Sequence, residues 1–331
     1  MNMALDTLFH PFQSGMLESQ GRALFLNAQH HAELSQFSNM TLQQVFKPYA
    51  DILQAAGYEF AIEIPEVMQS FDTVLLAAPK NQIETQYLMA RALQVLKPGG
   101  LLIVAAENKA GGSRLVKNFE HFGLNNIQSE SRNKARAVWT RCENFDEDTV
   151  KKALSDGAMQ SVLDGQFQSQ PGVYGWDKID QGSALLLDNL PDDLKGKGAD
   201  FGCGYGFLAK AVTQKSKVKS LTCMDADARA LEACRQNIEG VNYEWADLTR
   251  EIFPNAFDFI VMNPPFHEGK KTDITLGEKF IVNAAQSLKR KGSLYMVGNK
   301  HLPYENILSD KFFKVEKLFE GQGFKVFKAE K

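Results

Sequence analysis

The chain has 331 residues, of which 44% are apolar and 23% are charged, and its formal net charge at pH 7 is −3. This length is large for one hydrophobic core and suits two domains, and the composition is that of an ordinary soluble globular protein. The small negative charge argues against a generally basic nucleic-acid binder, although a local basic patch would be enough for contact with RNA.

The compartment can be predicted from three features. Residues 1–10 contain neither the basic nor the apolar segment of a signal peptide. The longest apolar runs, 73–78 and 101–106, are too short to cross a bilayer. The four cysteines show no metal-ligand spacing. We therefore expect a cytoplasmic protein that has no metal and no contact with a membrane. A monomer is a separate expectation, because none of these features reports the oligomeric state.

In the first half of the chain, predicted strands alternate with predicted helices, which indicates a parallel sheet. The strands are expected at 22–26, 60–64, 73–77 and 101–105, and the helices at 43–56 and 83–96. Paired strands are expected within 123–141, where the basic residues are Arg132, Lys134, Arg136 and Arg141. This basic cluster either protects a sheet edge from pairing or contacts RNA phosphates.

The second half repeats the alternation after a connecting segment. Residues 146–170 are predicted to link a domain at 1–145 to a domain at 171–331. Asp180 is predicted to cap a helix that starts the second domain. Strands follow at 197–201, 218–224, 243–246, 259–262 and 293–297, with helices at 208–213, 228–238 and 274–288, and two last strands flank 321–323.

The two halves resemble each other, which suggests a duplication. Phe71-Asp72 begins an apolar strand that ends in Ala77-Ala-Pro-Lys80, and Phe257-Asp258 begins one that ends in Asn263-Pro-Pro-Phe266. Each strand is followed by a helix, a Lys/Gly turn and another strand. The first copy lacks both the Asn-Pro-Pro-Phe turn and a glycine loop. We interpret it as a degenerate copy of the second, with chance similarity as the alternative.

The Asn-Pro-Pro-Phe turn predicts methylation of an exocyclic amine on a flat ring. The lone pair of such an amine is delocalised, and the Asn263 side-chain oxygen and the Pro264 carbonyl would accept its two N–H bonds. Pro264 and Pro265 make the turn rigid, and Phe266 would stack on the base and hold it in place. An ordinary turn after a strand is the alternative interpretation.

A glycine loop and three acidic residues indicate a cofactor site. Gly202, Gly204 and Gly206 follow a strand, where glycines let a ligand approach the backbone. Phe207 stands where a dinucleotide fingerprint needs its last glycine, so a nicotinamide cofactor is disfavoured. Asp200 would orient the loop, Asp225 would accept both ribose hydroxyls and Asp247 would meet an adenine amine. Turns or helix caps are the ordinary roles of each acid. Together they converge on S-adenosylmethionine.

These residues resemble the class I S-adenosylmethionine-dependent methyltransferases that modify exocyclic amines. More narrowly, the segments that follow resemble the family of bacterial ribosomal RNA small subunit methyltransferase C. They are Pro171-Gly-Val-Tyr174, Asp180-Gln-Gly-Ser-Ala-Leu-Leu-Leu187, Asn263-Pro-Pro-Phe-His-Glu-Gly269, Leu302-Pro-Tyr304 and Gly323-Phe-Lys-Val326. The resemblance implies an α/β fold of two tandem Rossmann-like domains. The N-terminal one would support folding and RNA contact, and the C-terminal one would be catalytic.

The resemblance also implies methylation of guanine N2 in 16S rRNA of the small ribosomal subunit, with the glycine loop and Asp225 on S-adenosylmethionine and Asn263 and Phe266 on a flipped guanine. Methylation of guanine N2 in 23S rRNA, methylation of adenine N6 and a non-enzymatic assembly factor remain alternatives. Cytosine C5 methylation is disfavoured because the turn offers no cysteine nucleophile. The candidate RNA contacts are Phe266, His267, Lys270, Lys271, Arg132, Lys134 and Arg136.

Overall fold

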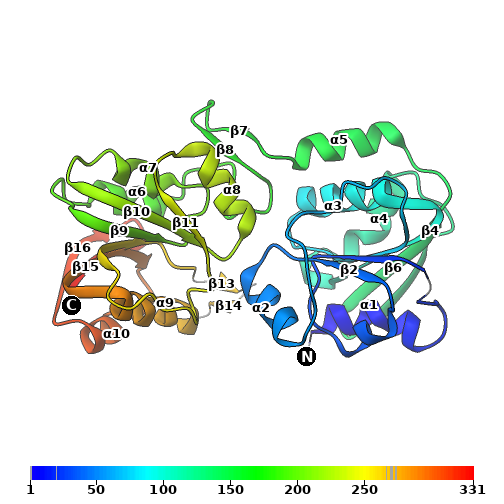
Figure 1. Ribbon diagram of the computed structural model, residues 1–331, viewed down its shortest axis with the longest axis horizontal. Coiled ribbons are helices and arrows are strands. Elements are labelled where there is room, and N and C mark those ends of the chain that lie inside the picture. Colours follow the sequence, from blue (N-terminus) through cyan, green and yellow to red (C-terminus); the bar gives the residue numbers. More distant parts are fainter. Residues whose placement is uncertain (1, 20, 266, 269–270, 273) are drawn as a thin grey trace. The chain divides into compact units, whose positions relative to one another are not determined.

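A computed structural model of the chain describes residues 2–19, 21–265, 267–268, 271–272 and 274–331, with side chains described outside 266–273. The chain forms two compact units, Met1–Ala158 and Met159–Lys331. Each unit is built around one large β-sheet with helices on both faces (Figure 1). Within the described ranges, no helix combines the length and the apolar character that crossing a bilayer requires.

The sheet of the first unit has six strands in the order β2-β1-β3-β4-β6-β5. Neighbouring strands from β2 to β4 are parallel, and β6 and β5 add two antiparallel pairings. The strands are β1 Ala23–Leu26, β2 Met40–Gln43, β3 Phe71–Ala77, β4 Leu96–Glu107, β5 Gln128–Arg132 and β6 Ala135–Cys142.

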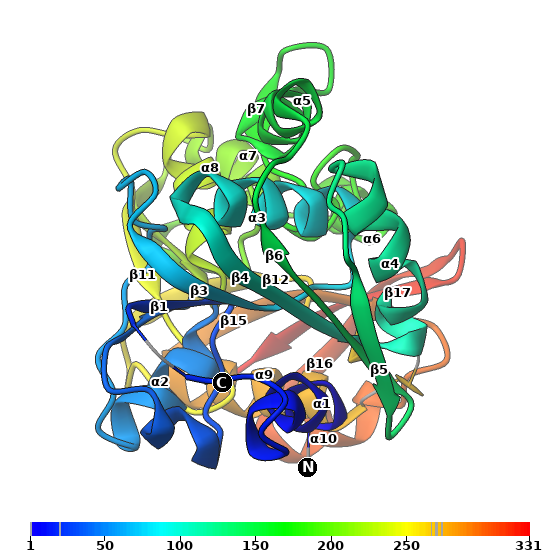
Figure 2. The same ribbon diagram turned by 90° about the vertical axis from the view of Figure 1, so that its right-hand side faces the viewer.

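The helices of the first unit cover the two faces of this sheet. Helices α1 (Met3–Gln13) and α2 (Lys47–Ala55) and the 3-10 turn η1 (Ala32–Gln36) pack on one face. Helices α3 (Gln82–Val95), α4 (Leu115–His121) and α5 (Glu147–Gly157) pack on the other. Figure 2 shows α1 and α3 on opposite sides of the strands. Two more 3-10 turns, η2 (Asn108–Ala110) and η3 (Gly112–Arg114), precede α4.

The sheet of the second unit has seven strands in the order β11-β10-β9-β12-β15-β17-β16. The strands are β9 Gly196–Phe201, β10 Val218–Asp225, β11 Asn242–Trp245, β12 Phe257–Met262, β15 Leu288–Asn299, β16 Lys314–Gly321 and β17 Phe324–Glu330. Two separate hairpins join β7 (Gln160–Val162) with β8 (Phe167–Ser169), and β13 (His267–Glu268) with β14 (Lys271–Thr272).

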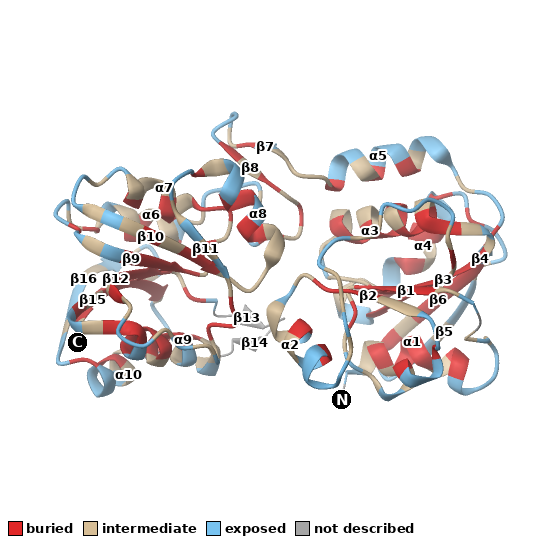
Figure 3. Ribbon diagram, in the orientation of Figure 1, coloured by how far each residue is buried: buried red, intermediate tan, exposed pale blue. Residues whose placement is uncertain are grey.

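The helices of the second unit are also divided between two faces. Helices α6 (Gln181–Asp188), α7 (Phe207–Thr213) and α8 (Ala228–Asn237) cover one face of the sheet. Helices α9 (Ile274–Ser287) and α10 (Tyr304–Lys311) cover the other. The central strands are therefore buried on both sides, as Figure 3 shows. This burial explains why β3 and β12 are continuous apolar runs, as strands inside a parallel sheet usually are.

Some predicted elements differ from the structure. The helix expected at 43–56 begins only at Lys47, because Gln43 ends strand β2 and Pro48 stands in the first turn of α2. The strand expected at 60–64 is reduced to one bridge between Gln43 and Ala61. Helix α1 was not predicted. The segment 146–170 carries α5, which packs in the first unit, and the β7–β8 hairpin of the second.

The two units share one topology. Strands β1, β3, β4, β6 and β5 of the first correspond in order to β9, β12, β15, β17 and β16 of the second, and β2 corresponds to β10. Of the seven strands in the large sheet of the second unit, β11 alone has no counterpart among the strands described in the first unit. The helices follow the same plan, since α1 and α6 each precede the first strand, and α3 and α9 each connect the matched parallel pair. The predicted repeat is therefore a repeat of folded structure.

Candidate functional site

The site lies at the carboxyl ends of β9, β10 and β12, which are neighbours in the sheet. The chain leaves β9 toward β10 on one side and later adds β12 on the other, so the order of strands reverses at β9. Such a reversal opens a crevice above the strand ends. Gly202 follows β9, Asp225 ends β10 and Asn263 follows β12. Three segments that are distant in sequence therefore meet at one edge.

The amide group of Asn263 is held by the first turn of α6. Its Nδ2 donates to Oδ1 of Asp180 at 2.7 Å and to Oγ of Ser183 at 2.9 Å. Because the Asp180 carboxylate only accepts, these contacts assign which end of the amide is nitrogen. Oδ1 of Asn263 is buried and has no hydrogen-bond partner among the described residues. One acceptor is thus left open at the end of β12.

The glycine loop is bound to Asp225. Oδ2 of Asp225 accepts the N–H of Gly204 at 2.9 Å, and its Oδ1 accepts the N–H of Asp227 at 2.9 Å. Gly204 has a φ of +54° and nothing within 4 Å of where a Cβ would stand, so its surroundings are open. Gly206 has a φ of +94°, and a Cβ there would approach Sγ of Cys234 to 2.9 Å. Gly204 thus faces open space, whereas Gly206 serves packing.

The electrostatics of the loop come from two buried carboxyl groups. Asp200 lies inside β9, and neither of its oxygens has a hydrogen-bond partner in the described part of the chain. Burial raises the pKa of Asp200 well above its ordinary value, and the nearby Cys223 and Asp225 add to the rise. Burial also raises the pKa of Asp225 to about 6. The loop-orienting bonds expected from Asp200 are instead made by Asp225.

Asp247 acts in the structure as the cap of a turn. Its Oδ1 accepts the backbone N–H of Thr249 at 2.9 Å and the hydroxyl of Thr249 at 2.6 Å. The residue is buried, two positions after β11. This is the ordinary role that the sequence left open as an alternative, and it places Asp247 at the same sheet edge as Asp225. Among the residues that the structure describes, no three His, Cys, Asp or Glu side chains are grouped to hold a metal ion.

A small pocket of about 60 Å³ joins part of the predicted site. Of the predicted residues, Asp200, Gly202, Gly204 and Asn263 line it, whereas Gly206, Asp225, Asp247, Pro264 and Pro265 do not. Further lining residues were not predicted as site residues, and they include Tyr174, Lys178, Asp180 and Ser183. Asp180 was predicted only as a helix cap. The Asp-x-Gly-Ser pattern of residues 180–183, which follows Tyr174, is the sequence feature that could have identified Asp180 and Ser183 as site residues.

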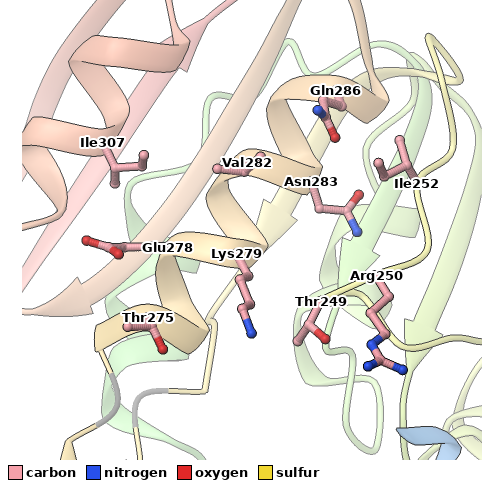
Figure 4. A pocket seen from close by; sticks show the side chains of 10 residues that line it. All are labelled: Thr249, Arg250, Ile252, Thr275, Glu278, Lys279, Val282, Asn283, Gln286 and Ile307. Carbon is pink, nitrogen blue, oxygen red and sulfur yellow. The ribbon is translucent and has the colours of Figure 1, made fainter.

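A larger hollow of about 440 Å³ lies between α9 and the loop after β11. Figure 4 shows Lys279 extending from α9, with Thr249 and Arg250 on the opposite side. Arg250 and Lys279 are exposed, and neither has an ion pair among the described residues. The loop is fixed by the buried Asn283, whose Nδ2 donates to the carbonyls of Leu248 and Glu251. The hollow therefore has a fixed wall and carries two cationic side chains that form no ion pair with any residue the structure describes.

The other predicted RNA contacts are only partly described. Phe266 and Lys270 lie outside the described residues, and His267 and Lys271 belong to the backbone of the β13–β14 hairpin. In the first unit, Arg132 and Lys134 are exposed at the turn between β5 and β6, and Nε of Arg136 donates to Oγ of Ser131. Strand β5 is a sheet edge, so both interpretations of this basic cluster remain open.

Comparisons with known proteins agree with this fold. Residues 164–328 match the family model of the methyltransferase small domain, and residues 17–145 match that of its N-terminal domain. The chain is 32% identical over 320 residues to the ribosomal RNA small subunit methyltransferase C of Cronobacter sakazakii, covering 96% of this chain and 90% of that protein. It is 29% identical over 325 residues to that of Shewanella sediminis, covering 94% and 88%.

A solved structure has a similar fold. The T. thermophilus 16S rRNA N2 G1207 methyltransferase, in complex with AdoMet and guanosine, superimposes with a TM-score of 0.79 at 23% identity. The alignment covers 97% of this chain and 91% of that one. Fold and strand-end site together define a methyltransferase with two Rossmann-like domains. The chain belongs to the ribosomal RNA small subunit methyltransferase C family. The predictions of the family, the fold and the enzyme class are confirmed.

Proposed function

We propose that this protein methylates the exocyclic N2 amine of a guanine in 16S rRNA of the small ribosomal subunit, with S-adenosylmethionine as methyl donor. The observation that carries the proposal is the buried Oδ1 of Asn263 at the end of β12, beside the glycine loop, which has no hydrogen-bond partner among the residues that the structure describes. A buried acceptor without a partner is costly unless a ligand satisfies it. The names of the relatives support rRNA as the substrate.

The residues at the loop fit this cofactor. S-adenosylmethionine supplies an electrophilic methyl group on a sulfonium, and its amino-acid part carries an ammonium group. Asp200 offers a buried carboxyl whose two oxygens have no hydrogen-bond partner in the described ranges, and a cation beside it would favour its ionised form. Gly202 and Gly204 leave room at the backbone. Asp225 keeps a second lone pair on each oxygen for ribose hydroxyls, and Asp247, after the neighbouring strand, would meet the adenine amine.

Asn263 would act on the target amine. Its Oδ1 and the Pro264 carbonyl would accept the two N–H bonds of the amine, which localises the lone pair on nitrogen and aims it at the methyl group. The contact strengthens as the nitrogen becomes tetrahedral, so it contributes to the rate more than to binding. The methylated ammonium is acidic, and therefore no strong base is needed. The proposal also retains Pro265 as part of the rigid turn and Phe266 as the stacking partner of the base.

Substrate RNA would be held by basic side chains outside the pocket. The candidates from the sequence are Arg132, Lys134, Arg136, His267, Lys270 and Lys271. The structure adds Arg250 and Lys279, whose charges are unpaired among the described residues and flank a hollow beside α9. Positively charged side chains of this kind can bind the phosphates of RNA. The first unit would support folding and RNA contact without binding cofactor, and the protein would act in the cytoplasm as a monomer.

The proposal is tested with small subunits and 23S rRNA isolated from a strain that lacks the gene. Each is incubated with the purified protein and isotopically labelled S-adenosylmethionine, and the nucleosides are identified by mass spectrometry. The expected product is N2-methylguanosine at one position of 16S rRNA. Label in 23S rRNA would favour the guanine-N2 alternative on the large subunit, and N6-methyladenosine would favour the adenine alternative. Cofactor binding without any methylated nucleoside would support an assembly factor.

A further inference from the structure

Asp180 is joined to the Asn263 amide by a contact that helix capping alone does not require. The two residues lie 83 positions apart in the sequence, yet Oδ1 of Asp180 accepts from Nδ2 of Asn263 at 2.7 Å. The same oxygen accepts the N–H of Ser183 at 2.9 Å, which makes Asp180 the N-cap of α6. One oxygen therefore links the start of α6 to the end of β12.

Both N–H bonds of the Asn263 amide are used by α6, because the second goes to Oγ of Ser183 at 2.9 Å. Within the part of the chain that the structure describes, the oxygen of the amide has no hydrogen-bond partner. An amide of this shape fits its cavity almost equally well when rotated by half a turn, which would present N–H groups in place of the oxygen. The carboxylate of Asp180 prevents this rotation, since it repels an oxygen and accepts from a nitrogen.

From this geometry we infer that Asp180, assisted by Ser183, is the positioning residue that fixes the orientation of the Asn263 amide, so that its oxygen faces the target amine. The inference rests on the proposed function, in which that oxygen accepts an N–H of the nucleobase. Asp180 itself does not touch the base. Its task is to exclude the rotated amide, in which a donor would oppose the N–H donors of the substrate and the rate would fall.

The test uses substitutions that separate positioning from capping. Asp180→Ser keeps a side chain that caps helices well but is too short to reach Asn263. Ser183→Ala removes the hydroxyl and leaves the backbone N–H that Asp180 caps. Asp180→Asn is the conservative control. Its side-chain oxygen can accept from both Ser183 and Asn263, so it should recover most of the rate. Asn263→Ala measures the whole contribution of the amide.

The measurement is the single-turnover rate of methylation of small subunits at saturating S-adenosylmethionine, beside the cofactor Kd and a melting curve for each variant. Asp180→Ser should lower the rate about 10- to 100-fold, the change expected when a hydrogen bond to a charged group is lost. The cofactor Kd and the melting temperature should stay near wild type. Ser183→Ala should lower the rate less, and the double variant should approach Asn263→Ala.

Three outcomes would overturn the inference, and they are distinguishable. If Asp180→Ser keeps the wild-type rate while Asn263→Ala is slow, Asp180 is only a cap and the proposed function stands. If Asp180→Ser weakens cofactor binding but turns over normally at saturation, Asp180 contacts the cofactor. If Asn263→Ala turns over normally, the proposed role of the amide fails, and the positioning role fails with it.

Discussion

The two units have matching networks at the amino ends of their central strands and different residues at the carboxyl ends. In the first unit, Asp72 accepts the backbone N–H of Arg22 at 2.8 Å and pairs with Lys97 at 2.7 Å. In the second, Asp258 accepts the N–H of Lys197 at 2.7 Å and pairs with Lys289 at 2.9 Å. Each aspartate thus ties three strands of its sheet together in the same way.

At the carboxyl ends, Gln44 stands in the first unit where Asp225 stands in the second. Oε1 of Gln44 accepts the N–H of Phe46, two residues on, as Oδ1 of Asp225 accepts that of Asp227. But Nε2 of Gln44 donates to the carbonyl of Ala28, so the buried amide is neutral and satisfied at both ends. Asp225 instead accepts a loop N–H with a carboxyl group that can ionise.

The residue after the central strand also differs. Ala77 ends β3 where Asn263 follows β12, and the Ala77 carbonyl accepts from Nδ2 of Asn27, the residue after β1. Asn27 stands at the position of Gly202, and its side chain is bound to the end of β3. The comparison teaches that the contacts which specify the fold are kept apart from the residues for which we propose a chemical role. One copy can therefore lack these residues and still fold.

The largest expected difference between the units is that the second unit binds the cofactor and the first does not. Calorimetric titration of the full chain with S-adenosylmethionine should give one site. Gly204→Val should abolish the heat, because a side chain there fills the open space at the loop and the φ of +54° strains any residue other than glycine. A stoichiometry of two sites would show that the first unit also binds cofactor, and a single site of wild-type affinity in Gly204→Val would show that the cofactor binds away from the loop.

Asn263→Ala should lower the single-turnover rate about 100- to 1,000-fold, the loss typical of removing one hydrogen-bonding group that acts in the transition state. RNA affinity and melting temperature should change little. The matched control is Asn27→Ala at the corresponding edge of the first unit, which should cost stability and leave the rate unchanged. A parallel loss of stability and rate in Asn263→Ala would mean that the turn is structural.

The substitution Asp225→Gln places in the second unit the residue type that the first unit has at the corresponding position, Gln44. Loss of charge-assisted hydrogen bonds to ribose should weaken cofactor binding by about 2–3 kcal/mol, less if water replaces the carboxylate. The fold should persist, because a glutamine at the corresponding position of the first unit accepts the equivalent N–H. The dissociation constant from calorimetry is the measurement, and an unchanged value in the folded variant would make Asp225 a turn residue alone.

Cofactor binding should also depend on pH. The pKa of Asp225 is raised by burial to about 6, so the carboxyl is protonated below that value and accepts ribose hydroxyls best above it. Affinity should therefore rise about tenfold from pH 5 to pH 7 and then level off. Asp225→Asn should remove most of this dependence. A dependence that survives in Asp225→Asn would assign it to another group, with the buried Asp200 as the first candidate.

The smallest expected effects concern RNA contact by the two units. Arg250→Gln with Lys279→Gln, and separately Arg132→Gln with Lys134→Gln, should each flatten the salt dependence of RNA binding by about one unit per lost phosphate contact. Lys152→Gln is the control, since that lysine already pairs with Asp156. If one of these double variants keeps the wild-type salt dependence of RNA binding, its two basic side chains are ordinary solvated residues that do not contact RNA.

Much of the fold followed from local pattern. The apolar runs of β3 and β12 predicted buried strands, and Asp180 predicted the start of α6, because burial and capping depend on residues close together in the sequence. Strand β2 and the late start of α2 were missed, since a four-residue edge strand is decided by its pairing with β1 and not by its own composition.

A full description of the site required both the sequence and the tertiary structure. The sequence placed Gly202, Asp225 and Asn263 at strand ends, which was enough to predict that they meet. Only the tertiary structure decided that Asp225 binds the glycine loop, that Asp200 is buried with no hydrogen-bond partner among the described residues, and that Asp180 and Ser183 hold the Asn263 amide. These are contacts between residues far apart in the chain. Burial and hydrogen-bond direction at such contacts depend on how the strands and helices pack, which no local pattern contains.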